Sequence, residues 1–476
     1  MKYDEIVSFF AFSFGGRKGL VVKGFNAYIK RFDAIEKSFI PPKKEWTPPD
    51  QALYGVKNLF DVPVKEAEKL RFKAIKYSFK HNYENNSFYR KMCKERDVKP
   101  EDIKTEKDFL KIPLLPDKFF KDYPEGKRFA IWLSNIFTGD LPNVFVEKKK
   151  PTKDDIINAF NKAGLHIAYS SGTSGRHTFI PRDEKTFNRT RYASAKAVAT
   201  MGYPNLDFDN VRGYISLYAE NINLFVAVMS AIFTDVFKHV DYGFVINREI
   251  TTDTLDAVMR GRKNLLLKLA ALWIDKTRVR RYIKWLVERS NAKHDIALLG
   301  APFFLNHLMG LLEKKGFSFD FGEHSFVMTG GGWKIREDAR ITTEMFRRKV
   351  EKVFGVPESN CLDAYGMVES NGFMTQCPEG HYLHIPYTYF YPIVLDKNGE
   401  PVGYGEKGRF AFLDSLATSY PGFIVSGDEV KLLEHCPVCD RPGPVLEPEV
   451  TRAKGEEVRG CAEELRRGLS ISSGGR

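Results

Sequence analysis

The sequence predicts an α/β protein in which mixed or parallel sheets are flanked by helices and followed by a β-rich part. Two observations predict this fold class. Between residues 155 and 370, short apolar runs alternate with amphipathic helical patterns, which is the rhythm of an α/β domain. From Tyr387 onward the pattern changes to strands, "YFYPIVLD" and then "GRFAFLD", with Asn398-Gly399 as a hairpin turn between them.

The individual elements follow from local patterns. The stretch "PPKKEWTPPD" is rich in proline and predicts a connector that breaks helix and strand alike. Residues 62–89 carry apolar side chains at helical intervals and predict a helix. Four later runs predict buried strands: "HIAYSS", "VRGYISLY", "DIALLG" and "SFVMTGG".

These patterns divide the chain into five parts. We expect an N-terminal extension over residues 1–60, a helical entry region over 61–150 and an α/β core over 151–386. A β-rich subdomain follows over 387–460, and a flexible arm occupies 461–476.

Composition and charge exclude several classes of protein. A hydrophobic content of 43% excludes disorder for the bulk of the chain. The net charge of +12 is compatible with nucleic acid, a membrane surface or small anionic ligands, but the basic residues are scattered, so we expect no nucleic acid. No secretory signal is evident, and the longest apolar run, 224–233, is too short to span a bilayer. We expect a cytoplasmic protein without a membrane span.

The stretch "YSSGTSG" (169–175) places hydroxyls and glycines directly after a predicted strand. An ordinary surface loop is one interpretation. The other is an anion-binding loop, because glycines let the main chain approach a phosphate closely. Arg176, Arg182 and Lys185 follow and would add positive charge.

Three further motifs favour a nucleotide site. "VMTGGGW" is a strand that runs into three glycines and an aromatic residue, which suits a flat ring lying on main chain. "DAYGMVES" follows at the distance of one more α/β unit. "YPGFIVSGDEVKLL" places Asp428 where a carboxylate accepts both hydroxyls of a ribose.

This order of motifs resembles the adenylate-forming superfamily of acyl-CoA synthetases, phenylacetate-CoA ligases and luciferases. "TGGGWK", "DAYGMVES" and the arginine-glycine-cysteine ending are most similar to the acyl-protein synthetases of bacterial bioluminescence, the LuxE family. The resemblance covers residues 60–465 at motif level. It implies the fold of the superfamily's N-terminal domain, without the full C-terminal domain.

The resemblance also implies roles for residues, with ATP and Mg2+ as cofactors. Tyr365 would stack on the adenine, Asp428 would hold the ribose, and Arg452 would reach ribose or phosphate. Glu369 would hold Mg2+. The remaining ATP-binding positions are the phosphate loop and the adenine segment: Ser170, Ser171, Gly172, Thr173, Ser174, Gly175, Gly330, Gly331 and Gly332.

Two departures from the superfamily pattern matter. Val368 stands where the pattern Tyr-Gly-x-Thr-Glu has threonine, so one phosphate-contacting hydroxyl is missing, and Thr329 or Ser370 would substitute for it. The superfamily normally continues with a further domain, which carries a catalytic lysine and a surface for CoA. Here 16 residues follow Gly460, and this disfavours a standard two-domain CoA ligase.

Cysteines and histidines predict a structural zinc site. Cys436 and Cys439 have the Cys-x2-Cys spacing of a zinc half-site, and "CPEGHYLH" supplies Cys377 with either His381 or His384. His384 matches the zinc histidine of phenylacetate-ligase relatives. The alternatives are unrelated thiols or a redox pair.

Cys461, in "VRGCAEELRRG", has neighbouring arginines that would stabilise a thiolate. It would otherwise be a small buried apolar residue. In the LuxE family, a cysteine near this end accepts the acyl group.

The resemblance therefore implies a ligase that activates a carboxylic acid, by this resemblance a fatty acid, as an acyl-adenylate and passes the acyl group to a protein cysteine. Its partners would be the small-molecule acid and an acyl-accepting protein such as a reductase or carrier. Two alternatives remain: CoA as the acceptor, and a non-catalytic nucleotide-binding protein of the same fold. Phe303 and Phe304 are candidate residues of the acyl pocket.

Overall fold

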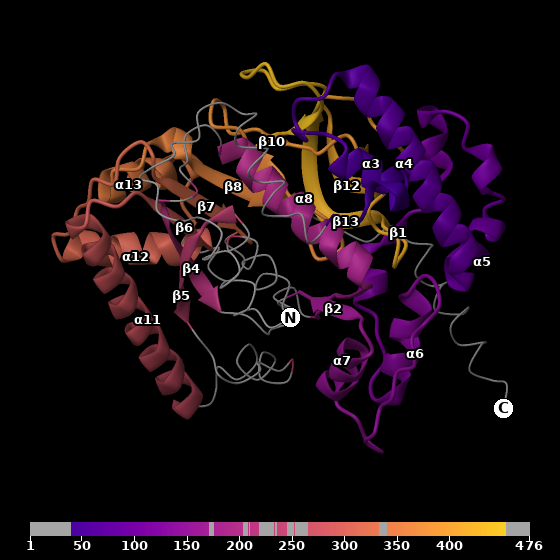
Figure 1. The fold of residues 1–476 in the computed structure, drawn as a ribbon, viewed down its shortest axis with the longest axis horizontal. Coiled ribbons are helices and arrows are strands. Elements are labelled where there is room, and N and C mark those ends of the chain that lie inside the picture. Colours follow the sequence, from indigo (N-terminus) through magenta and orange to yellow (C-terminus); the bar gives the residue numbers. More distant parts are fainter. Residues whose placement is uncertain are drawn as a thin grey trace.

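The structure is a computed structural model of the 476-residue chain. It describes residues 40–170, 176–202, 208, 210–218, 233, 236–244, 252, 265–332 and 340–453. Figure 1 shows these parts as a coloured ribbon.

The described strands form one large mixed sheet and one separate hairpin. The large sheet has the order β11-β12-β13-β14-β10-β9-β8-β7-β6-β4-β5, and β1 and β15 add to β13. The pairs β5–β4, β4–β6, β6–β7 and β7–β8 are parallel. Along the rest of this order, from β8 through β9, β10, β14, β13 and β12 to β11, every pair is antiparallel. The predicted mixture of a parallel α/β part with a β-rich part is confirmed.

The strands have the following bounds: β1 Leu115–Pro116, β2 His166–Tyr169, β3 Phe179–Arg182, β4 Arg212–Tyr218, β5 His239–Phe244, β6 Ile296–Gly300, β7 Phe326–Gly330, β8 Cys361–Tyr365, β9 Met374–Gln376, β10 Leu383–His384, β11 Phe390–Leu395, β12 Lys407–Asp414, β13 Phe423–Leu433, β14 Val445–Leu446 and β15 Thr451–Arg452. Residues 166–169 of the predicted run "HIAYSS" form β2, which lies outside the large sheet and pairs antiparallel with β3.

The described α-helices are α3 Pro48–Tyr54, α4 Val64–Asn85, α5 Ser87–Glu95, α6 Lys127–Ile136, α7 Lys153–Lys162, α8 Glu184–Gly202, α11 Leu265–Asn291, α12 Pro302–Lys314 and α13 Thr343–Phe354. Short 3-10 helices are η1 Lys43–Glu45, η2 Pro100–Asp102, η3 Glu106–Lys111, η4 Asp117–Phe120 and η6 Glu358–Asn360.

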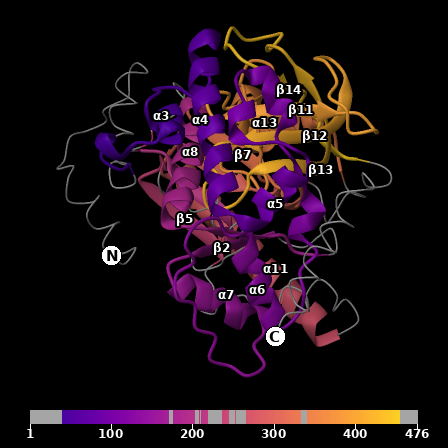
Figure 2. The ribbon, with the colours of Figure 1, turned by 90° about the vertical axis from the view of Figure 1, so that its right-hand side faces the viewer.

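Helices cover the two ends of the sheet separately. Figure 1 shows α11, α12 and α13 beside the parallel strands, and α3, α4 and α5 beside β12 and β13. The view turned by 90° places α4 and α5 in front of the same β-rich end (Figure 2). Two apolar cores correspond to these ends, a small one under α11 to α13 and a large one that fills the rest.

The proline-rich connector contains a helix, so the prediction that it breaks all secondary structure is wrong in part. Pro48 and Pro49 occupy the first turn of α3, where a missing N–H removes no intrahelical bond. Thr47 precedes the helix, and its N–H and hydroxyl both donate to Asp50, at 2.8 and 2.6 Å.

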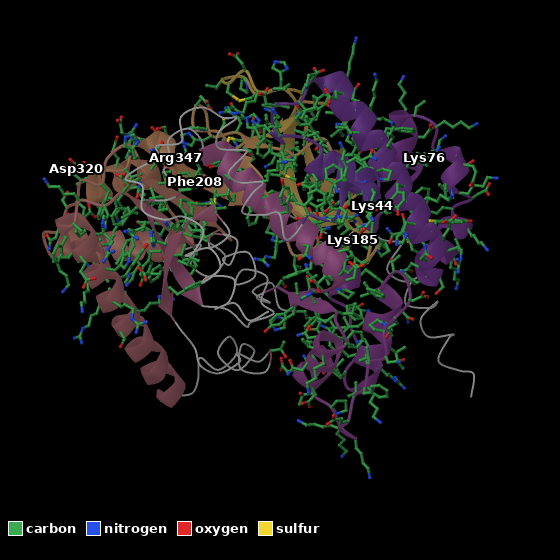
Figure 3. The ribbon with its side chains drawn as sticks, viewed as in Figure 1. Lys44, Lys76, Lys185, Phe208, Asp320 and Arg347 are labelled. Carbon is green, nitrogen blue, oxygen red and sulfur yellow. The ribbon has the colours of Figure 1, made fainter. Side chains whose placement is uncertain are left out.

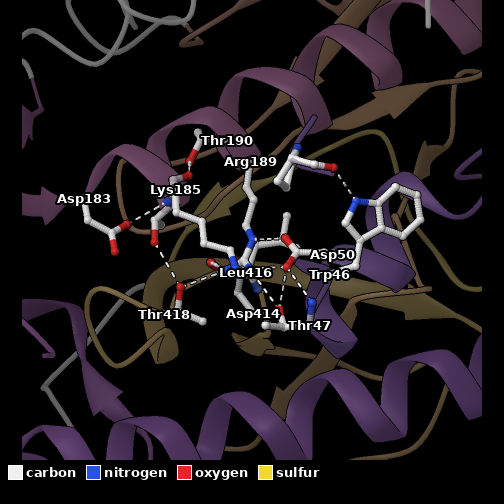
Figure 4. A network of polar contacts seen from close by, with 12 residues as sticks. Trp46, Thr47, Asp50, Asp183, Lys185, Arg189, Thr190, Asp414, Leu416 and Thr418 are labelled. Atoms are coloured by element: carbon white, nitrogen blue, oxygen red, sulfur yellow. Dashed lines mark hydrogen bonds and ion pairs between the residues drawn. The ribbon is translucent and has the colours of Figure 1, made fainter. Parts of the chain in front are cut away.

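A buried ion pair ties this helix to the core (Figure 4). Arg189 Nε on α8 donates to Asp50 Oδ1 at 2.8 Å, and Arg189 Nη1 donates to Thr418 at 2.8 Å. Burial alone would raise the pKa of Asp50, but bonds from Arg189 and Thr47 outweigh it and lower the pKa to about 2. Residues 47–54 are therefore part of the folded body.

Antiparallel β11 and β12 confirm the predicted pair of strands. Gly399 has a φ of +86°, as a tight turn at Asn398-Gly399 requires. The connection is longer than a two-residue hairpin, because β12 begins only at Lys407.

Candidate functional site

The predicted adenine segment lies where two parallel strands end side by side. Gly330 ends β7 and is in register with Ala364 on β8, one residue before Tyr365. Gly331 and Gly332 have φ values of +81° and +64°. Apart from each glycine and its chain neighbours, no heavy atom of the described residues lies within 4 Å of the place that a Cβ would take at either. This stretch of bare main chain beside Tyr365 can accept a flat ring.

Tyr365, Asp428 and Arg452 form a connected group next to that segment. The Tyr365 hydroxyl donates to Asp428 Oδ2 at 2.8 Å, and Arg452 Nη1 lies 3.1 Å from Asp428 Oδ1. Asp428 faces Arg452 because β15 pairs antiparallel with β13 at this position. Burial and the Asp428 charge raise the pKa of Tyr365 well above its usual value, so its hydroxyl stays a donor.

The predicted phosphate loop connects β2 and β3. Ser170 closes its base, because Ser170 N donates to Thr178 O at 3.0 Å and Thr178 N donates to Ser170 Oγ at 2.9 Å. A ring nitrogen of His177 lies 2.7 Å from Ser170 O. The remaining predicted loop residues lie outside the described part of the chain: Ser171, Gly172, Thr173, Ser174 and Gly175.

Glu369 lies near Thr178, which bonds Ser170 at the base of this loop. It is 6% exposed, and burial raises its pKa, whereas Lys121 and the Thr178 hydroxyl act to lower it. A buried carboxylate beside the phosphate loop fits Mg2+, which prefers oxygen ligands and is commonly shared with substrate phosphates. Glu369 would hold the ion, and the ion would neutralise phosphate charge.

Two charged residues near Glu369 were not predicted. Asp117 and Lys121 form an ion pair of 2.5 Å at η4, and both affect the pKa of Glu369. A Cβ at Gly427 would lie 3.1 Å from Asp117 Oδ2 and 3.0 Å from Arg452 Nη1. The helix η4 therefore also adjoins the connected group that contains Asp428 and Arg452. The local sequence gives no signal for this, because the contact depends on β1 pairing with β13.

The three basic residues after the phosphate loop contact protein groups. Arg176 donates to Tyr123 O at 2.7 Å, and Lys185 lies 3.2 Å from Asp50 (Figures 3 and 4). Arg182 is 1% exposed and donates to the loop that carries Glu369. Arg182 therefore points into the core and bonds protein carbonyls there, and its expected contribution of charge to the phosphate loop stays a prediction.

The hydroxyls expected to replace the missing threonine also have protein acceptors. Thr329 donates to Asp363 Oδ1 at 2.7 Å, and Ser370 donates to Met367 O at 3.0 Å. Asp363 N in turn donates to Gln376 Oε1, which also accepts from Arg347 of α13 at 3.4 Å (Figure 3 labels Arg347). Val368 is buried in the large core.

Cys377, His384, Cys436 and Cys439 meet in one cluster. Their four ligand atoms all lie within 4.8 Å of one another, and Cys439 Sγ is 3.4 Å from His384 Nε2. Burial lowers the pKa of His384 to about 4, so its ring is neutral and can ligate. Three thiols and one imidazole are a donor set that fits tetrahedral zinc.

The histidine of this cluster is His384, which β10 places opposite Thr375 of β9. His381 is in the turn between these strands, with a φ of +60°, and its Nε2 lies 3.1 Å from Glu358 O. An ion pair of 2.7 Å between Arg441 and Glu379 joins the turn to the Cys436–Cys439 knuckle.

The acyl-pocket candidates differ from each other. Phe304 is buried in the small core, packs on Tyr282 at a centroid distance of 6.1 Å and has the Arg278 guanidinium 3.6 Å from its ring centre. Phe303 is partly buried at the edge of that core. Cys461, the predicted acyl acceptor, lies outside the described residues.

Comparisons with known proteins agree with this arrangement of motifs. The family model "Acyl-protein synthetase, LuxE" matches residues 274–470. The chain is also 23% identical over 413 residues to the long-chain-fatty-acid–luciferin-component ligase of Vibrio harveyi, covering 87% of this chain and 91% of that one. The chain is therefore similar to the LuxE ligases. A second ligase of the same name, from Aliivibrio fischeri, is 24% identical over 405 residues and covers 84% of this chain and 88% of its own.

Solved structures support the fold of this LuxE-like chain. A 2-hydroxyisobutyryl-CoA ligase in the postadenylation state aligns with a TM-score of 0.57 at 15% identity, over 88% of this chain and 74% of that one. The open conformation of the same ligase aligns with a TM-score of 0.53 at 15% identity, over 83% and 71%. The predicted adenylate-forming fold is confirmed, and the expected ligase class agrees with the names of both curated relatives.

Within the described residues, no helix is both long enough and apolar enough to cross a bilayer.

Proposed function

We propose that this LuxE-like chain activates a long-chain fatty acid with ATP, forms an acyl-adenylate and transfers the acyl group to Cys461. The observation that supports activation most strongly is the group of Tyr365, Asp428 and Arg452 beside the bare main chain of Gly330 to Gly332. A carboxylate bonded to Tyr365, whose strand ends beside the open glycine segment, suits a ribose joined to adenine. The names of the curated relatives support a long-chain fatty acid as substrate.

In the first step, a carboxylate oxygen of the acid attacks the α-phosphorus of ATP. The bond from that phosphorus to the β-phosphate oxygen breaks, pyrophosphate leaves, and an acyl-AMP anhydride remains. Asp428 holds the ribose, and Ser170 with the glycine-rich loop surrounds the phosphates. Electrostatic stabilisation of this kind needs positioned charges and no protein nucleophile.

In the second step, the thiolate of Cys461 attacks the acyl carbonyl carbon. The bond from carbon to the phosphate oxygen breaks, AMP leaves with the electron pair, and a thioester forms. The support for Cys461 comes from sequence, because it lies inside the 274–470 span matched by the family model and has arginines nearby.

We also propose that the cluster of Cys377, His384, Cys436 and Cys439 binds one structural zinc ion. All four ligand positions come from protein, so the site has no open position for substrate. The ion would join the Cys436–Cys439 knuckle to His384 on β10. Because the knuckle directly follows β13, this would also fix the end of the strand that carries Asp428.

Acid-dependent ATP–pyrophosphate exchange tests the proposal. The purified protein is assayed with saturated fatty acids of graded chain length, with and without CoA. We expect exchange that depends on a long-chain acid and not on CoA. Formation of acyl-CoA when CoA is added favours a CoA ligase, and no exchange with any acid favours a non-catalytic nucleotide-binding protein.

A further inference from the structure

Arg182 is a buried cation that the proposed chemistry leaves unused. It ends β3, four residues after Thr178, and its side chain is 1% exposed. A buried guanidinium has a high desolvation cost, so its partners indicate what it does. Three of its hydrogen bonds go to one loop, residues 368–371.

The bonds from Arg182 bracket Glu369 on both sides. Arg182 Nη2 donates to Val368 O at 2.7 Å and to Ser370 O at 3.0 Å, the carbonyls immediately before and after Glu369. Arg182 Nε donates to Asn371 Oδ1 at 2.9 Å. One rigid, planar group therefore fixes the backbone on each side of the proposed metal carboxylate.

Tyr420 completes the frame. Its hydroxyl donates to Glu369 O at 2.9 Å, and it accepts from Arg182 Nη2 at 3.3 Å and from Asn371 Nδ2 at 2.9 Å. Asn371 N and Nδ2 both donate to Asp414 Oδ2, at 2.7 and 3.0 Å. These groups are buried, so water does not compete for the bonds.

The same hairpin also influences the Glu369 side chain. Thr178, at the base of the phosphate loop, acts to lower the pKa of the Glu369 carboxyl. The β2–β3 hairpin thus adjoins Glu369 at Thr178 and holds the flanking backbone through Arg182. Thr178 and Arg182 of this hairpin therefore connect the base of the phosphate loop with Glu369, the proposed metal ligand.

We propose that Arg182 is a positioning residue that sets Glu369 relative to the β2–β3 hairpin and thereby enables the Glu369 carboxylate to hold a metal ion. This inference rests on the proposed function. A purely structural role, neutralising Asp414 in the core, would lower stability without a specific effect on metal binding.

Metal binding measured apart from turnover tests it. Free Mn2+ is followed by EPR during titration of the full-length protein in the presence of AMP-CPP, an ATP analogue whose α,β bridge is carbon. Arg182→Lys keeps the charge but loses the planar fork, and Tyr420→Phe removes only the hydroxyl that holds Glu369 O. Arg189→Lys is the matched control, because Arg189 is as buried as Arg182, at 0% exposed, but donates to Asp50 and Thr418 instead.

We expect Arg182→Lys to weaken Mn2+ affinity about tenfold, as loss of a group that orients a metal ligand does. Tyr420→Phe should weaken it less, and Arg189→Lys should not change it. Adding Arg182→Lys to Glu369→Gln should give no further loss, since both act on one metal contact.

Two results would overturn the inference alone: wild-type Mn2+ affinity in both Arg182→Lys and Tyr420→Phe, or an equal loss in Arg189→Lys. If the wild-type protein binds no Mn2+ with AMP-CPP, the proposed function fails and this inference fails with it. Because Tyr420→Phe removes a single oxygen atom, it keeps the test decisive if Arg182→Lys does not fold.

Discussion

The Tyr365 hydroxyl donates to Asp428 Oδ2 at 2.8 Å and joins the last residue of β8 to the middle of β13. Arg452 lies 3.1 Å from the other carboxylate oxygen. The carboxylate is therefore held from both sides, in an orientation set by two different strands. Because the carboxylate is already held in place, it can accept a pair of ligand hydroxyls without first rearranging.

Asp428→Ala should raise the KM for ATP about 10- to 100-fold, because hydrogen bonds to a charged acceptor contribute about 1.5–3 kcal/mol. Tyr365→Phe should raise it less, since the carboxylate remains but loses one of its two supports. Tyr404→Phe is the control, because Tyr404 is 56% exposed on the surface. Steady-state ATP–pyrophosphate exchange measures all three. An unchanged KM in Asp428→Ala would remove Asp428 from the ribose site.

Glu369→Gln should lower kcat for exchange about 100-fold while leaving the KM for the fatty acid unchanged. The amide keeps the shape of the side chain but loses the charge that a metal ligand supplies as the transition state develops. Glu447→Gln, a partly exposed residue paired with Lys431, is the control and should behave as wild type. Equal kcat values in the two variants would contradict a metal role for Glu369.

Elemental analysis of protein that has never met a chelator should find one zinc per chain. Cys436→Ala should lose the zinc and about 4 kcal/mol of unfolding free energy, the range in which loss of a metal site falls. Cys93→Ala should keep the zinc, because Cys93 is buried on α5 away from the cluster. Wild-type protein with well under one equivalent of zinc would exclude the site.

Asp363 makes stability depend on pH in a stated direction. Burial raises its pKa to about 6, against about 3.9 in an unfolded chain. Between these two pKa values the native state holds a proton that the unfolded state has released. The protonated Asp363 therefore favours the fold at low pH, and this contribution is lost as pH rises through about 6. Asp363→Asn removes the dependence.

Urea unfolding of wild type and Asp363→Asn at pH 4.5 and pH 7.5 checks this. The unfolding free energy of wild type minus that of the variant should be about 2 kcal/mol lower at pH 7.5 than at pH 4.5. A difference between the proteins that is independent of pH would mean that Asp363 has an ordinary pKa.

Much of the fold could be predicted from the sequence because its signals are local. The apolar runs at 211–218, 295–300 and 325–331 appear as β4, β6 and β7 within a residue or two of the predicted ends. The helix predicted over 62–89 is α4 followed by α5, interrupted at Asn86, whose side chain caps α5 by accepting from Tyr89 N. Periodicity and capping residues carry this information directly.

The parts that could not be predicted depend on contacts between distant segments. Asp117 reaches the site because the two-residue strand β1 pairs with β13, and a strand of that length has no periodicity to detect. Arg182 follows the glycine-rich loop in sequence, and this nearness predicts that it adds positive charge at the phosphates. All four residues of β3 are buried, so nearness in sequence did not decide where its side chain points. The choice of His384 over His381 likewise needed the β9–β10 register.

Covalent acylation of Cys461 tests the central claim most directly. The full-length protein is incubated with ATP, Mg2+ and the fatty acid that supports exchange, and intact mass and peptide mapping follow the acyl group. We predict an ATP-dependent mass increase of one acyl group that hydroxylamine removes and that maps to Cys461. Cys461→Ser should lose this label but keep pyrophosphate exchange. A label on another residue, or acylation of CoA by a Cys461→Ser variant at the wild-type rate, would contradict the account.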